Sequence, residues 1–185
     1  MRKPIQLTCL SLLLSATTLP ANAATDITSE NSANNLQAEI SRVQIEWQDP
    51  TSYSDVRAAN QSRKHFREKT FNRLEKHLEK LASKLPDGQT LKLSVTDLDL
   101  AGRVWPGSFM GLNTAGDVRI VKRVDFPSMQ FSYTLVDAQN SVIKTGEEKL
   151  RDLSFQDRAN RHFRSDALRY EKRMLDDWFG KTFKD

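Results

Sequence analysis

Apolar side chains recur along this chain with two different periods, and the order of those periods constrains the fold. Val43, Ile45 and Trp47 alternate with polar residues, which is typical of a half-buried strand. From about residue 62 to residue 85 the apolar spacing changes to three and four, which predicts an amphipathic helix ended by Pro86-Asp87-Gly88. Its apolar stripe comprises Phe71, Leu74, Leu78, Leu81 and Leu85.

Alternation with period two returns after residue 90 and predicts four further strands, whose short connections favour antiparallel pairing. We expect them at residues 91–100, 118–124, 129–135 and 142–150. Leu168 and Leu175 belong to a second helical pattern, which we expect Ser165 or Asp166 to cap and Gly180 to end. The order strand, helix, four strands, helix predicts an α+β fold: a mainly antiparallel sheet of about five strands with both helices on one face.

The apolar positions of the strand at 91–100 shift by one residue partway along it, which implies a bulge or a strand end near Thr96. Without a bulge, Asp97 and Asp99 would continue the buried face and need partners or a raised pKa. With a bulge, both carboxylates would turn toward solvent. The arginines expected to pair with them are Arg103, Arg119 and Arg151.

Residues 101–116 combine glycines with large apolar side chains and are expected to form a long loop. The apolar members are Trp105, Phe109, Met110 and Leu112. Such side chains must be covered by the rest of the domain, by a ligand or by a partner, and the sequence leaves these alternatives open. We expect the aromatic residues and the Asp97/Asp99 pair to share a recess at one end of the sheet.

The first residues have the order of a secretory signal peptide. Arg2 and Lys3 precede a short apolar run, and Ala21-Asn22-Ala23 offers small residues at a cleavage site. We therefore expect a signal peptide at 1–23, a flexible leader at 24–41 and a single α+β domain at 42–185. The apolar run is too short to span a bilayer, so no transmembrane segment is expected.

Removal of 23 of the 185 residues leaves 162, a length that suits one domain with its own core. The only cysteine, Cys9, leaves with the signal peptide, so disulfides and cysteine ligands are not expected. The formal charge of +4 falls to +2 without Arg2 and Lys3, which gives no argument for nucleic-acid binding.

Common catalytic patterns do not occur in the sequence. The histidines, His65, His77 and His162, have no zinc-type spacing, and there is no Gly-x-Ser-x-Gly elbow or nucleotide-binding loop. We therefore expect no cofactor and no metal. A basic face on the first helix could instead contact anionic lipid or an acidic partner. Its members are Lys69, Arg73, Lys76, Lys80 and Lys84.

Several segments resemble an uncharacterised family of secreted bacterial proteins, catalogued as the domain-of-unknown-function family DUF3016. They are Trp47-Gln48-Asp49-Pro50, Tyr53-Ser54-Asp55-Val56-Arg57, residues 95–102, Leu150-Arg151-Asp152-Leu153, and residues 168–178. The resemblance implies a single domain in the periplasm of a Gram-negative bacterium and supplies no catalytic residues. Ala167 stands where this resemblance would place a proline at the start of the last helix.

These observations favour a non-enzymatic periplasmic module that binds an envelope component or a protein partner through residues 101–116 and the charged groups at their base. The candidate binding residues are Arg57, Asp97, Asp99, Arg103, Trp105, Arg151 and Asp152. Two alternatives stay open: a carboxylate-dependent hydrolase or metal-binding enzyme using Asp97, Asp99 or Asp152, and adhesion to anionic membrane through the basic face. The enzyme requires two of these carboxylates to converge in a pocket with a perturbed pKa.

Overall fold

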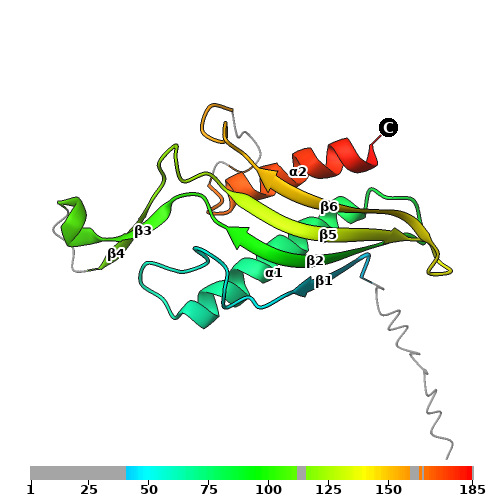
Figure 1. Cartoon of the computed structure of the whole chain (residues 1–185), viewed down its shortest axis with the longest axis horizontal. Helices are drawn as coiled ribbons and strands as arrows, with labels where there is room; N and C mark the ends of the chain where they lie inside the picture. Colours follow the sequence, from blue (N-terminus) through cyan, green and yellow to red (C-terminus); the bar gives the residue numbers. More distant parts are fainter. Residues whose placement is uncertain (1–40, 112–115, 159–162, 164, 185) are drawn as a thin grey trace, which may run out of the picture. The chain divides into compact units, whose positions relative to one another are not determined.

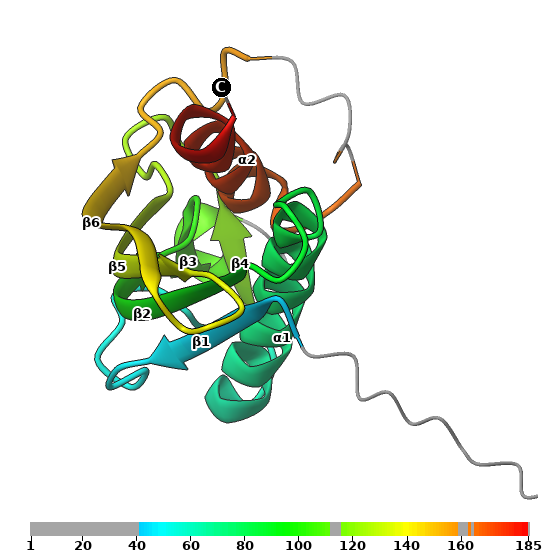
Figure 2. The same ribbon diagram turned by 90° about the vertical axis from the view of Figure 1, so that its right-hand side faces the viewer.

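The computed structural model describes residues 41–111, 116–158, 163 and 165–184. Its main sheet has the strand order β1-β2-β5-β6. The strands are β1 (Val43–Trp47), β2 (Thr90–Asp99), β5 (Ser128–Val136) and β6 (Val142–Arg151). Helices α1 (Arg63–Ala82) and α2 (Arg169–Phe183) cover one face of this sheet (Figures 1 and 2). The predicted α+β class is confirmed, whereas the signal peptide and residues 24–40 of the leader lie outside the described residues.

The helices lie on this face because it carries the buried apolar residues of β2 and β5 and partly buried ones of β1 and β6, such as Ile45, Trp47 and Leu150. Leu93 of β2 pairs with Tyr133 of β5, Val95 pairs with Phe131, and all four side chains are buried. Trp178 of α2 meets Phe131 and Tyr133 edge-on, with ring centroids 4.8 and 5.5 Å apart. The opposite face carries polar residues such as Lys92, Ser94, Ser132 and Thr134.

Helix α1 buries the predicted apolar stripe, Phe71, Leu74, Leu78, Leu81 and Leu85, although Leu85 lies just beyond its last residue. Trp47 of β1 stacks on Phe71 with ring centroids 4.1 Å apart and donates its Nε1–H to Glu75 at 2.7 Å. Strand β1 runs parallel to β2, because α1 carries the chain back between them. The other two pairings of the main sheet, β2 with β5 and β5 with β6, are antiparallel as predicted.

Two predictions about the middle of the chain are wrong. Residues 101–116 are not a simple loop, because they contain β3 (Arg103–Pro106) and the short 3₁₀ helix η1 (Gly107–Met110). The strand expected from 118 to 124 ends at 120, and Val124 is 76% exposed. Among the described residues that strand, β4 (Asp117–Ile120), pairs with β3 alone. The described main sheet therefore has four strands, and β3 and β4 form a second sheet of two strands. We call β3, η1 and β4 the ribbon; Figure 1 shows it beyond one end of the main sheet.

The end of α2 also differs from the prediction. The helix continues through Gly180 to Phe183, because Phe183 packs against the rings of Tyr133 and Trp178 and holds the last turn on the core. At its start the N-cap residue is Leu168, whose N–H donates to the predicted cap Asp166 at 2.8 Å. Neither helix, nor any other helical segment in the described part of the chain, is long and apolar enough to cross a membrane.

Candidate functional site

The predicted bulge lies in β2 and decides where Asp97 and Asp99 point. Val95 pairs with Phe131 and Asp97 pairs with the next residue of β5, Gln130, so the register skips Thr96. Leu98 returns to the buried face as a result. Asp97 and Asp99 therefore alternate onto the polar face of the sheet, and both are half-buried there.

Asp99 lies in an unusual electrostatic environment for a residue on a polar face. Burial, followed by the carboxylates of Asp55 and Asp97, raises its pKa from 3.8 to about 6, while Arg103 and Arg119 oppose the shift. Two of the three predicted arginines, Arg103 and Arg119, thus lie near Asp99 but form their ion pairs with other acids. Arg103 pairs with Asp125 at 3.1 Å and Arg119 pairs with Asp55 at 2.9 Å.

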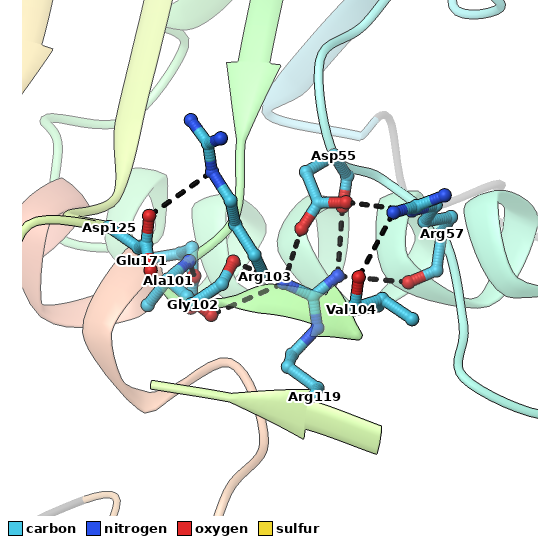
Figure 3. A network of polar contacts seen from close by, with 9 residues as sticks. All are labelled: Asp55, Arg57, Ala101, Gly102, Arg103, Val104, Arg119, Asp125 and Glu171. Atoms are coloured by element: carbon cyan, nitrogen blue, oxygen red, sulfur yellow. Dashed lines mark hydrogen bonds and ion pairs between the residues drawn. The ribbon is translucent and has the colours of Figure 1, made fainter. Parts of the chain in front are cut away.

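Arg119 of β4 is the centre of a polar network that holds the base of the ribbon (Figure 3). Its Nη1 donates to Asp55 Oδ2 at 2.9 Å and to the carbonyl of Gly102 at 2.8 Å. Its Nη2 donates to the carbonyls of Asp55 and Arg57, each at 2.9 Å. The planar guanidinium satisfies several acceptors at once, so the segment around Asp55 is fixed to both strands of the ribbon.

Arg57, a predicted site residue, belongs to the same network. Its Nε donates to Asp55 Oδ1 at 3.1 Å and its Nη2 donates to the carbonyl of Val104 in β3 at 3.1 Å (Figure 3). Gly102 allows this close packing, because it has a φ of 80° and a Cβ there would lie 2.5 Å from the carbonyl oxygen of Ile120.

Beyond this network, the ribbon presents an aromatic pair. Trp105 is half-buried and stacks with Phe109 at a centroid distance of 6.4 Å, and Phe109 is 79% exposed. Lys122 places its ammonium group 5.0 Å from the centre of the Trp105 ring. The Nε1–H of Trp105 is buried and has no hydrogen-bond partner among the described residues. The ribbon thus carries an apolar, partly exposed surface, which we call the aromatic tip.

The remaining two candidates, Arg151 and Asp152, lie on the two faces of the sheet. Arg151 is exposed and pairs with Ser128, which also pairs with Asp99 in the β2 register. Asp152 is 5% exposed, and its carboxylate accepts a hydrogen bond from Arg158 at 2.5 Å. Arg158 also binds Asp177 of α2 at 2.5 Å, on the helix-covered side. The structure brings Asp97 together with Asp99 but does not bring Asp152 to them.

A buried glutamate that the sequence analysis did not single out lies beside the base of the ribbon. Glu171 of α2 is 2% exposed, and its Oε1 accepts the backbone N–H of Ala101 at 2.7 Å. It lines a cavity of about 350 Å³, which we call the Glu171 cavity. Its other lining residues include Phe66, Lys69, Arg73, Leu100, Arg119 and Leu168. The sequence did indicate that Glu171 is buried, because it falls on the apolar stripe of the second helix between Leu168 and Leu175.

The predicted basic face of α1 is not continuous, and the described residues form no cluster of metal ligands. Across the described residues, no three or more His, Cys, Asp or Glu side chains are placed to hold a metal ion. The predicted basic face of α1 is divided, because Arg73 forms an ion pair with Asp166 and Lys69 lines the Glu171 cavity. Lys76, Lys80 and Lys84 are exposed.

Comparison with known proteins places the chain in a family. A family model described as "Protein of unknown function (DUF3016)" matches residues 41–181, which include every described strand and most of α2. No curated protein and no solved structure matches the chain.

Proposed function

Because the chain belongs to the DUF3016 family, its function has to be inferred from its own geometry, and we propose that it is an exported, non-enzymatic binding module of the cell envelope. The proposed partner is an envelope protein that docks on the aromatic tip. The signal-like order of residues 1–23 supports export to the periplasm.

The observation that carries this proposal is the stack of half-buried Trp105 and exposed Phe109 on a ribbon whose base is fixed. Trp residues provide a large share of the binding energy in protein interfaces, and a preorganised surface loses little entropy when it binds. Arg119 and Arg57 supply that preorganisation. Arg57 binds the backbone of β3 at Val104, and Arg119, itself a residue of β4, binds the carbonyls of Gly102 and Arg57 beside the ribbon. Lys122 adds a cation at the rim of the aromatic tip.

A photocrosslinking experiment in a Gram-negative host tests the proposal. The full chain carries a photoreactive amino acid either at position 109 or at position 142. Val142 is 63% exposed and begins β6, at the opposite end of that strand from Arg151. We expect a discrete protein adduct from position 109 only, and its loss in a Trp105→Ala background that keeps the melting temperature. Equal adducts at both positions, or none at 109, would contradict docking at the aromatic tip.

A carboxylate-dependent reaction is the second candidate, because Asp97 and Asp55 both act on Asp99, whose pKa of about 6 suits a general base near neutral pH. Hydrolysis of p-nitrophenyl acetate and p-nitrophenyl phosphate by the purified chain provides a direct test. Activity that rises with an apparent pKa near 6 and disappears in Asp99→Asn would support it. Activity that is absent, or unchanged in Asp99→Asn, would remove this candidate.

A further inference from the structure

The Glu171 cavity contains a carboxyl group that the protein satisfies only in part. Oε1 of Glu171 accepts the N–H of Ala101, whereas Oε2 is buried and has no hydrogen-bond partner among the described residues. An unsatisfied polar atom in the interior costs about 1–3 kcal/mol, and more when it carries charge. Oε2 lacks a hydrogen-bond partner in either protonation state. An ionised carboxyl has no donor at Oε2, and a protonated one has no acceptor for its proton.

The walls of the cavity complement this carboxyl with two other kinds of surface. Phe66, Leu100 and Leu168 provide apolar area on which a short hydrocarbon body can pack. Lys69, Arg73 and Arg119 provide positive charge. Two of these cations are already paired, Arg73 with Asp166 and Arg119 with Asp55, whereas Lys69 is exposed at the rim. One acidic group in the interior and a cation at the rim define a dipolar site.

We propose that the Glu171 cavity binds a small zwitterion, an organic molecule that carries a primary ammonium group and an anionic group on a short hydrocarbon body. The ammonium group donates to Glu171 Oε2, and the anionic group, a carboxylate or a phosphate, pairs with Lys69. A cavity of about 350 Å³ is within the usual range for small-molecule sites. This site is separate from the aromatic tip, so it does not depend on the proposed protein partner.

The protonation of Glu171 provides an independent signature of the proposed contact. Burial raises the pKa of Glu171, while the backbone N–H groups of Ala101 and of Glu171 itself, followed by the positive charges of Arg119 and Arg169, oppose the shift. The other charged residues that line the cavity are Lys69 and Arg73 of α1, and Arg73 pairs with Asp166 near the start of α2, which also binds Lys172. An ammonium group that donates to Oε2 favours the ionised carboxylate, so binding should release a proton wherever the free carboxyl is protonated.

Calorimetric titration of the full chain tests the site with three zwitterions: 6-aminohexanoate, leucine and phosphoethanolamine. We expect saturable binding of at least one of them, with affinity at least about tenfold above that of hexylamine or hexanoate, which each carry a single charge. Glu171→Gln replaces the acceptor at Oε2 by a donor and should lower the affinity for the zwitterion by about tenfold or more. Lys69→Ala, an exposed position, should weaken the carboxylate or phosphate probe but not hexylamine.

The matched control is Glu75→Gln, which alters a half-buried glutamate of α1 that lines a different cavity and should leave binding unchanged. If Glu171→Gln fails to fold, two measurements still test the proposal. One is the effect of Lys69→Ala on binding, and the other is proton release by the unmodified chain, read from the buffer dependence of the binding heat. Failure of all three zwitterions to bind at millimolar concentration would overturn the proposal. Binding unchanged in both Glu171→Gln and Lys69→Ala, or binding without proton release below the pKa of Glu171, would also overturn it.

Discussion

The backbone N–H of Ala101 donates to the buried carboxyl of Glu171 at 2.7 Å, which joins the start of the ribbon to α2 across 70 residues of sequence. The carbonyl of the same residue accepts a hydrogen bond from Arg119 at 3.3 Å. A single peptide segment therefore connects the polar network under the ribbon with the acid of the Glu171 cavity. A substitution on either side of this segment should therefore alter the stability of the other side.

Glu171→Gln and Glu171→Leu should affect stability differently. Glutamine keeps an acceptor for the Ala101 N–H and removes a group whose pKa is raised by burial, so we expect unfolding free energy equal to or above that of the unmodified chain at pH 7.5. Leucine leaves the buried N–H unpaired and should lower stability by about 1–3 kcal/mol. Urea denaturation followed by circular dichroism measures both, and a larger loss for glutamine than for leucine would contradict this reasoning.

Asp99→Asn should stabilise the protein in a pH-dependent way. The folded-state pKa of about 6 exceeds the ordinary value of 3.8, so the folded protein binds more protons than the unfolded chain between these values. The stability contributed by Asp99 is therefore present below about pH 3.8 and is lost as pH rises to about 6. Asparagine should raise the melting temperature at pH 7.5 and leave it nearly unchanged at pH 4. An equal shift at both pH values would show that the effect is not electrostatic.

Arg119→Met should be strongly destabilising, because it leaves the 8%-exposed Asp55 without the 2.9 Å ion pair and frees several backbone carbonyls. Because Arg57 still pairs with Asp55 at 3.1 Å, we expect a loss below the roughly 3–5 kcal/mol that a fully unpaired buried charge costs, but above that of an exposed pair. The control is Arg123→Ala, which breaks an exposed pair with Asp157 at 2.7 and 2.8 Å and should cost about 0–1 kcal/mol. Chemical denaturation of both variants provides the comparison, and similar losses would mean that the network around Arg119 adds little.

Gly102→Ala should loosen the ribbon while the main sheet stays intact. The positive φ and the short Cβ contact with Ile120 both require glycine there. Gly111→Ala is the matched control, because Gly111 has a φ of 70° but a Cβ would meet nothing within 4 Å. Hydrogen exchange should show faster exchange of β3 and β4 in Gly102→Ala and unchanged exchange of β2 and β5 in both variants. Uniform loss of protection throughout the chain would instead indicate global unfolding.

The sequence predicted those parts of the fold whose side chains repeat over several turns or alternations. The stripe of α1 and the alternation in β2, β5 and β6 are long enough to be specific, and the shift between Val95 and Leu98 located the bulge. The ribbon could not be predicted in the same way. Each of its strands has four residues and includes charged or proline positions, so its pairing depends on Gly102 and Arg119 rather than on periodicity.

For the candidate site, the sequence could predict which residues lie near one another but not which of them form pairs. Asp97 and Arg103 do lie near Asp99, and Arg57 joins the same region through Asp55 and the carbonyl of Val104 at the base of the ribbon. Trp105, however, contacts Phe109 and Lys122, so a recess shared with the two aspartates stays a prediction. Which arginine pairs with which acid depends on three-dimensional packing between distant segments, which spacing along the chain does not encode.

The bulge at Thr96 also has a consequence for the direction of the ribbon. Around it, the carbonyl of Val95 accepts hydrogen bonds from the N–H of Gln48 and the hydroxyl of Tyr53, at 2.9 and 2.8 Å. A supernumerary residue bends a strand and increases its twist, and the ribbon begins only a few residues later. A shortened chain without Thr96 would keep every side chain of β2 on its present face but would launch the ribbon at another angle. The number of residues in β2, together with the contacts of Arg119 and Gly102 at the base of the ribbon, thus sets the direction of the aromatic tip.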